Sequence, residues 1–217
     1  MTRIAIVTDI HHGAPSHTKR GDTALDLLGQ FADWANAQKP DLVLDLGDRI
    51  SDIDTQTDLR LEGEVADVFA RLNAPVYHIC GNHDRDHLTV AENEEILGVD
   101  LHNQVIDLGD WQLVLWRADA KIHRTAPDIG FDLPESDLLW LSHTLQHATK
   151  PTLIASHVPC SGHSQIGNYY FQRNESLSTY PQADRVREVL AQARVPLVCI
   201  AGHVHWNTVT TVDGTPH

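Results

Sequence analysis

Short apolar runs that predict β-strands alternate along this chain with longer amphipathic segments that predict helices. The strand-like runs cover residues 4–8, 42–46, 76–80, 152–156 and 197–201, with hairpins at 105–116 and around 213–214. The helical periodicity covers residues 23–38, 61–72, 89–97, 134–147 and 183–193. Because strands that alternate with helices are typical of layered α/β folds, we expect this class, with antiparallel hairpins added to it.

The length and composition of the chain are those of a globular domain. It has 217 residues, of which 41% are hydrophobic and 21% charged, so disorder is not expected. We find no apolar run that approaches the ~20 residues of a membrane span, and no secretory signal at the N-terminus. The three cysteines, Cys80, Cys160 and Cys199, form no CxxC pair, which indicates a reducing compartment. We therefore expect one domain over residues 1–217 and a cytoplasmic location.

The acidic balance of the chain limits its partners. The formal net charge is −14, and the 16 Lys and Arg residues are scattered, so a nucleic-acid groove is not expected. If the substrate is a phosphate ester, metal ions or single arginines must meet its charge. The 15 histidines are one source of ligands for such metals.

Polar side chains follow five of the predicted strands at the point where each strand ends. These side chains are Asp9, His11, Asp48, Asn82, His157, His203 and His205. Because ligands in open α/β sheets bind outside the carboxyl ends of the strands, we expect all seven to meet at one edge of the fold.

The residue types in this set indicate divalent metals. Histidine nitrogens, carboxylates and an amide oxygen, without a pair of thiolates, form a borderline-hard site. Seven ligands exceed the four that zinc typically takes, whereas two metals that share a carboxylate would use them all. Two-metal sites are a recurrent solution for displacing an oxygen at phosphorus. We expect two divalent ions, and Mn, Fe and Zn all accept such ligands.

The ordered motifs Asp-x-His, Gly-Asp, Gly-Asn-His-Asp, His and Gly-His-x-His resemble those of the calcineurin-like metallophosphoesterase superfamily, over residues 9–205. The resemblance implies a four-layered α/β/β/α sandwich of the metallophosphoesterase type. It assigns one metal to Asp9, His11 and His205, the other to Asn82, His157 and His203, and the bridge between them to Asp48. It also implies that His83 faces the leaving group as general acid or transition-state stabiliser, with Asp84 beside it.

The implied mechanism follows from the charge of the two metals. A water between two divalent ions has its pKa lowered, which gives a metal-bridging hydroxide as the nucleophile. A positioned acid that protonates the leaving group typically contributes ~10²–10⁴-fold, and His83 is the candidate.

Two features depart from the family pattern. The second motif is usually Gly-Asp-x-x-Asp, but Ser51 stands where the second Asp is expected and Asp52 lies one residue later. The support that this Asp gives to the catalytic histidine in some relatives is therefore left open for His83. The chain also stops at His217, directly after a hairpin turn, where relatives usually continue through another strand. We expect a truncated C-terminus.

Substrate contacts are expected from a long segment and two arginines. Residues 158–182 have no clear periodicity and form a substrate-side loop that carries His163, Tyr169 and Tyr170. Tyr169 and Tyr170 are candidates for gripping the substrate, and packing of the loop or a subunit contact is the equal alternative. Arg49 and Arg85, each beside a metal motif, are candidate phosphate contacts, and surface salt bridges are the simpler account.

We expect a small-molecule phosphodiesterase, closest in style to the bacterial enzymes for cyclic nucleotides or glycerophosphodiesters. A phosphomonoesterase or phospholipid-directed phosphoesterase is the alternative within the same chemistry. A non-catalytic scaffold on the same fold is a remote third reading, because every position of the centre is filled. The sequence leaves formation of a homo-oligomer open.

Overall fold

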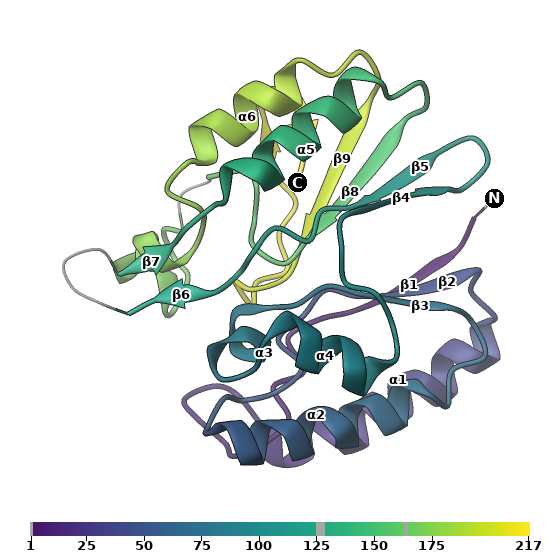
Figure 1. The fold of residues 1–217 in the computed structure, drawn as a ribbon, viewed down its shortest axis with the longest axis vertical. Helices are drawn as coiled ribbons and strands as arrows, with labels where there is room; N and C mark the ends of the chain where they lie inside the picture. The colour runs from purple at the N-terminus through teal and green to yellow at the C-terminus, as the bar shows by residue number, and fades with distance from the viewer. Residues whose placement is uncertain (1, 125–128, 163–164) are drawn as a thin grey trace. The chain divides into compact units, whose positions relative to one another are not determined.

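The computed structural model describes residues 2–124, 129–162 and 165–217 of the chain. These residues form two compact units, Met1–Leu101 and His102–His217. Each unit has its own sheet and its own helices (Figure 1). The single domain over residues 1–217 stays a prediction, and His163 of the predicted loop lies outside the described residues.

The first unit is built on a parallel three-stranded sheet in the order β1-β2-β3. Its strands are β1 (Ile4–Val7), β2 (Leu42–Asp45) and β3 (Val76–His78). Its helices are the 3₁₀ turn η1 (Gly21–Thr23), α1 (Ala24–Gln38), α2 (Thr55–Phe69), α3 (Asn82–Asp86) and α4 (Val90–Leu97). In this unit the carboxyl ends of all three strands lie along one edge of the sheet, because the strands are parallel.

The two long helices of this unit form because their apolar residues repeat at helical spacing. In α1, Leu28, Ala32 and Ala35 fall on one buried face, and the helix ends at Lys39, which has a left-handed backbone. Asp54 caps α2, since its carboxylate accepts the backbone N–H of Thr57 at 2.9 Å. These helices pack against the sheet through two apolar clusters, Leu28, Ile50, Leu61, Val65, Phe69 and Leu88, and Ala5, Ala35 and Val43.

The second unit is built on a four-stranded mixed sheet in the order β4-β5-β8-β9. Its strands are β4 (Gln104–Asp107), β5 (Gln112–Leu115), β8 (Thr152–Ser156) and β9 (Leu197–Ala201). The pair β4–β5 is antiparallel, whereas β5–β8 and β8–β9 are parallel. Two small hairpins accompany the sheet, β6 (Ile122–His123) with β7 (Gly130–Phe131), and β10 (Thr211–Val212) with β11 (Thr215–Pro216).

Helices α5 (Glu135–Gln146) and α6 (Ala183–Ala191) cover this sheet (Figure 1). Leu138, Leu141 and Leu145 of α5 are buried with Val186 and Leu190 of α6 in one apolar cluster. The cluster also contains the fully buried Trp116, whose indole N–H donates to the carbonyl of Asp137 at 3.0 Å, so its one polar atom is satisfied.

The mixed α/β class predicted from the sequence is confirmed, and both sheets and both groups of helices that the α/β/β/α sandwich requires are present. The hairpins predicted at 105–116 and around 213–214 are also confirmed. The sequence did not predict α3, the β6–β7 hairpin, or the 3₁₀ helices η2 (Phe171–Arg173) and η3 (Glu175–Leu177). Within the described part of the chain, no helix combines the length and apolar character that crossing a membrane requires.

Candidate metal centre

The loops after β1 and β2 stay paired beyond the ends of the strands. The backbone N–H of Asp9 donates to Gly47 at 2.9 Å, and that of His11 donates to Asp48 at 2.9 Å. The His11 Nε2 atom lies 3.9 Å from Asp9 Oδ1 and 3.6 Å from Asp48 Oδ2. The first unit therefore brings three of the predicted ligands together, within 4.8 Å of one another.

Most predicted ligands have an unusual backbone. Among the described residues, the positive φ angles outside glycine include 54° at Asp9, 51° at His11, 56° at Asp48, 73° at His203 and 49° at His205. A left-handed conformation in a residue other than glycine is strained, and it persists only where the surrounding structure imposes it. Such strain clusters at functional sites, so the concentration here independently supports a site at these residues.

Gly47 lets the second and third motifs approach each other. Gly47 has a φ of 97°, and a Cβ at this position would overlap the backbone of Gly81. Gly81 precedes α3, whose first residue is the buried Asn82. The next residue, His83, donates its backbone N–H to Asp48 Oδ1 at 2.9 Å, which fixes this carboxylate beside the start of α3.

Asp84 lies inside the loops of the predicted centre. Its carboxylate accepts the backbone N–H groups of Asp48 at 3.0 Å, Arg49 at 2.7 Å and Gly81 at 2.8 Å. The side chain is fully buried. The sequence placed Asp84 among the catalytic residues, and the structure gives it contacts typical of a positioning residue that ties two metal motifs together.

The structure does not support the phosphate contact that the sequence suggested for Arg49. The guanidinium is fully buried and pairs with the carboxylates of Asp45, Glu62 and Asp84. The surface salt bridge that we considered simpler is also wrong, because the pairing occurs in the interior. Asp45 has a structural role as well, since its carboxylate also contacts His78 at 2.9 Å.

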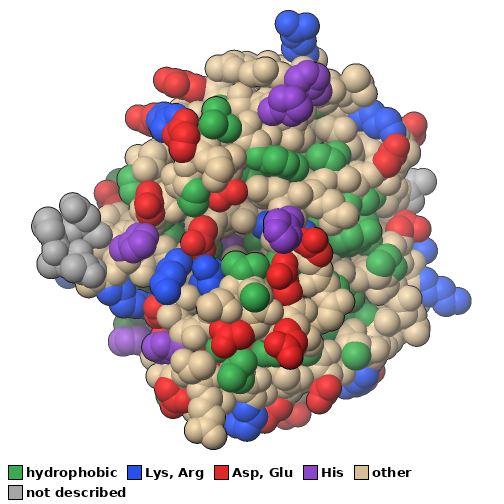
Figure 2. Space-filling model, viewed as in Figure 1, with side chains coloured by type: hydrophobic (Ala, Val, Ile, Leu, Met, Phe, Trp, Pro, Cys, Tyr) green, Lys and Arg blue, Asp and Glu red, His purple; other side chains and the backbone are tan. Residues whose placement is uncertain are grey.

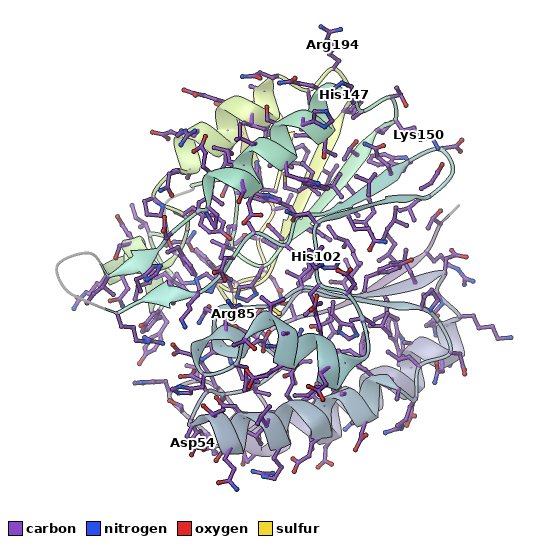
Figure 3. All side chains as sticks on the ribbon, in the orientation of Figure 1. Asp54, Arg85, His102, His147, Lys150 and Arg194 are labelled. Atoms are coloured by element: carbon purple, nitrogen blue, oxygen red, sulfur yellow. The ribbon has the colours of Figure 1, made fainter. Side chains whose placement is uncertain are left out.

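Arg85 projects from α3 and is half-buried (Figure 3). Its guanidinium donates to the carbonyl of Leu88 at 2.6 Å, within its own segment. A substrate contact of Arg85 stays a prediction.

Asp52 supports His83 in place of the missing Asp at position 51. The Asp52 carboxylate is hydrogen-bonded to Nδ1 of His83. Ser51 instead donates its hydroxyl to the carbonyl of His11 at 3.0 Å. The shift of the carboxylate by one residue along the loop therefore preserves its contact with the histidine.

The other ring nitrogen of His83 contacts a residue that the sequence did not single out. Lys19 Nζ lies 2.7 Å from His83 Nε2. Burial lowers the pKa of His83 and so does the Lys19 ammonium, but the carboxylates of Asp48 and Asp52 outweigh them, and the net shift is upward. His83 also lies 4.0 Å from Asp48 Oδ2, beside the predicted ligands of its own unit.

In the second unit, the remaining predicted histidines follow the ends of β8 and β9. The rings of His157 and His203 are both buried, with centroids 5.1 Å apart. The Nε2 atom of His203 contacts the carbonyl of Leu177 at 2.6 Å. A metal-binding histidine usually donates the N–H of its second ring nitrogen to a carbonyl or carboxylate. In His203 this arrangement would leave Nδ1 to face a metal. His205 is exposed and follows on the same segment.

The substrate-side loop is hydrogen-bonded to the histidine segment, residues 203–205. Asn168 donates its amide to the carbonyl of Val204 at 2.9 Å, and its oxygen accepts the backbone N–H groups of Tyr170 and Phe171. Tyr169 is 79% exposed, so it does not pack into the core of its unit. This part of the loop therefore lies next to the segment that carries His203 and His205. A substrate contact of its tyrosines stays a prediction.

Aromatic side chains pack around His203 and the loop, and the sequence analysis did not single out two of them, Phe131 and Trp206. Phe171 packs on His203 with ring centroids 4.9 Å apart, and Phe131 of β7 packs on it at 5.2 Å. Trp206 lies close to Gly167 of the loop. A Trp that directly follows His205 was a signal available in the sequence, whereas Phe131 is distant from every motif.

The residues of each unit fit divalent metals. The first unit offers carboxylate oxygens and an imidazole within 4.8 Å, and the second offers the ring nitrogens of His157 and His203 at the same spacing. This mixture of oxygen and nitrogen donors suits Mn, Fe and Zn.

Comparison with known proteins identifies the family of the chain. The family model described as calcineurin-like phosphoesterase matches residues 2–207. The chain therefore belongs to the calcineurin-like phosphoesterase family. A search of curated proteins found no match.

Two solved structures show the same fold. A dimetal phosphatase from Danio rerio is similar with a TM-score of 0.75 and 17% identity, over 100% of this chain and 86% of that one. The phosphopantetheinyl hydrolase of Mycobacterium tuberculosis is similar with a TM-score of 0.57 and 12% identity, over 99% and 87%. At these identities the likeness shows the metallophosphoesterase fold and not a substrate.

Proposed function

We propose that the chain hydrolyses small-molecule phosphodiesters at two divalent metal ions. The ions are held by Asp9, His11, Asp48, Asn82, His157, His203 and His205. The observation that carries this proposal is the left-handed backbone at five of these seven residues, in a chain of the calcineurin-like phosphoesterase family. When bound, two such ions supply positive charge that neutralises phosphate oxygens and activates water.

The protein's own residues orient the Asp48 carboxylate, which would be shared by the two metals. The backbone N–H of His83 engages Asp48 Oδ1, so Oδ2 is the oxygen directed toward His11. The backbone N–H of Asp48 is in turn held by Asp84. These two hydrogen bonds fix the position of the carboxylate before any ligand arrives, which lowers the cost of binding.

His83 is the proposed general acid. Its contact with Asp52 through Nδ1 fixes the ring and directs Nε2 away from that carboxylate. Nε2 can then donate a proton to the oxygen of the leaving group. Such proton donation typically contributes ~10²–10⁴-fold to the rate.

The exposed tyrosines support a diester over a monoester. Tyr169 and Tyr170 lie on the loop that Asn168 fastens to the histidine segment, and they offer aromatic surface to a second ester substituent. On the face drawn in Figure 2, Lys and Arg side chains lie scattered among Asp and Glu, which suits a small substrate better than a nucleic acid. The three free cysteines support a reducing compartment such as the cytoplasm.

A phosphomonoesterase is the second candidate, because the Danio rerio relative is called a phosphatase. Hydrolysis of bis-p-nitrophenyl phosphate and of p-nitrophenyl phosphate, compared on the same manganese-loaded protein, distinguishes the two. We expect the larger kcat/KM for the diester.

The ligand assignment is tested with His203→Ala and the matched control His147→Ala, which changes an exposed histidine at the end of α5 (Figure 3). We expect His203→Ala to lose metal, measured by elemental analysis after dialysis, together with diesterase activity. His147→Ala should keep both. Full metal content and activity in His203→Ala would refute the assignment.

A further inference from the structure

We propose that Lys19 binds the leaving group of the substrate and selects leaving groups that carry their own negative charge. The proposal rests on the proposed function, because it takes His83 as the residue that faces the leaving group. It adds a substrate class, namely phosphodiesters whose leaving group is a phosphorylated or carboxylated alcohol.

A tight turn holds Lys19 near His83. The backbone N–H of Lys19 donates to Ser16 at 2.8 Å, and the N–H of Ser16 donates back to Lys19 at 3.2 Å. Just before and after this turn, the N–H of Gly13 donates to Gly21 at 3.3 Å. The lysine side chain is half-buried rather than extended into solvent. The loop thus presents an ammonium group at a defined place.

The contact with His83 defines that place. In the structure the Lys19 ammonium donates to Nε2 across 2.7 Å, while Asp52 contacts Nδ1; when Nε2 carries a proton, the leaving oxygen takes the place of the ammonium as the partner of this nitrogen. A leaving oxygen within hydrogen-bond distance of Nε2 must therefore lie within a few ångströms of the ammonium. Lys19 precedes His83 by 64 positions in the chain. The contact between them therefore forms only in the folded protein.

Charge then determines which leaving groups benefit. An ammonium attracts a second anionic group at short range, and a hydrogen bond to a charged group is stronger than one between neutral groups. A neutral alcohol offers no such partner. Arg20, the next residue, instead pairs with Asp22 at 3.4 Å and is exposed, so it provides a matched control on the same loop.

The test compares two diesters that transfer the same phenyl phosphate. In one the leaving group is p-nitrophenol, and in the other it is p-nitrophenol with a carboxylate beside the nitro group, so both release a coloured product. We measure kcat/KM for both with manganese-loaded wild type, Lys19→Met and Arg20→Met. The ratio of carboxylated to uncharged substrate should fall about 10- to 100-fold in Lys19→Met, as expected for one hydrogen bond to a charged group. It should stay at the wild-type value in Arg20→Met.

A second readout does not depend on catalysis. Acetylation of individual lysines in the wild type is followed by mass spectrometry, with and without the carboxylated nitrophenol. We expect this product to slow acetylation of Lys19 severalfold and to leave Lys39, at the end of α1, unchanged.

The outcomes separate the two proposals. An unchanged substrate ratio in Lys19→Met, or an equal loss on both diesters, would overturn the role of Lys19 while the proposed function stands. Absence of hydrolysis of either diester by wild type would count against the proposed function, and the acetylation rates would then decide whether Lys19 binds the anion. Equal acetylation of Lys19 with and without the anion would overturn that binding.

Discussion

Replacing Arg49 by methionine should lower the free energy of unfolding by about 3–5 kcal/mol, the usual cost of breaking a buried ion pair from one side. Methionine keeps much of the apolar volume of the arginine stem, so loss of charge is the main change. The prediction tests the structural role of Arg49 against the phosphate contact that its position beside Asp48 first suggested.

The expected magnitude follows from the number of groups that share the guanidinium. It forms ion pairs with Glu62, with Asp45 at 2.8 Å and with Asp84 at 3.3 Å. It also donates to the carbonyl of Ile79 at 2.9 Å. All three carboxylates are fully buried. Because one cation compensates three acids, its removal leaves more than one desolvated carboxylate without a counter-ion. We therefore expect a loss toward the upper end of the range.

The loss should grow with pH because of Glu62. Burial raises the pKa of Glu62 from 4.5 to about 7, although Arg49 opposes this shift. A carboxyl whose folded pKa lies above its unfolded value contributes stability that is present below pH 4.5 and is lost as the pH rises through 7. Without Arg49 this loss is larger. The destabilisation should therefore be greater at pH 8 than at pH 5.5.

Urea unfolding of metal-free wild type and variant, followed by tryptophan fluorescence at the two pH values, measures both effects. Arg71→Met is the matched control, because Arg71 forms an ion pair of 2.7 Å with Asp33 in which both side chains are at least half exposed. We expect that control to cost less than ~1 kcal/mol. A cost below ~1 kcal/mol for Arg49→Met, with a changed KM, would contradict the structural role and restore the substrate contact.

Two further predictions concern the same unit. In Asp52→Asn, the loss of stability of metal-free protein should be larger near pH 5.5 than at pH 8.5, measured by urea unfolding. His83 lowers the pKa of Asp52 despite the opposing effect of burial, and that of His83 is raised, so the pair stabilises most between the unfolded pKa values of ~4 and ~6.5; a loss independent of pH would contradict the pairing. Gly47→Ala should lower the thermal midpoint by several degrees, because its Cβ meets the backbone of Gly81 and its φ is 97°; an unchanged midpoint would show that the two loops do not approach closely.

The places of the predicted ligands at the strand ends follow from the sequence, because parallel strands bring their carboxyl ends to one edge of each sheet. Asp9 follows the apolar strand β1 and Asp48 follows the buried strand β2, and the parallel register of the two strands aligns them directly. Position along the strand is therefore enough to place these side chains. The same reasoning works for His157 and His203, which follow the paired strands β8 and β9.

The partners of His83 were not predictable in this way. Asp52 and Lys19 lie on loops, where no periodicity relates position in the sequence to direction in space. Helix α3 spans only Asn82–Asp86, too short for a periodic signal. Arg49 was misread for a related reason: a charged residue beside a polar motif is usually exposed, and its partners Glu62 and Asp84 lie 13 and 35 positions away. Such contacts appear only when the chain is folded.

The left-handed backbone at the predicted ligands and the buried ion pairs of Arg49 are two parts of one arrangement. A left-handed backbone costs ~1–3 kcal/mol at each residue, so Asp9, His11 and Asp48 together cost roughly 3–9 kcal/mol, comparable with the whole stability of an ordinary domain. Hydrogen bonds of Asp84 to the backbone of both motifs oppose relaxation of these loops, and Arg49 keeps that carboxylate compensated in the interior. Glycine at the positions of the predicted ligands would remove the strain, but it would also remove the side chain that could bind a metal. Glycine instead occurs next to them, at Gly47 and Gly81. The buried polar cluster thus offsets the strain at the predicted ligands, and we expect changes in it to affect the affinity for metal as well as the stability of the fold.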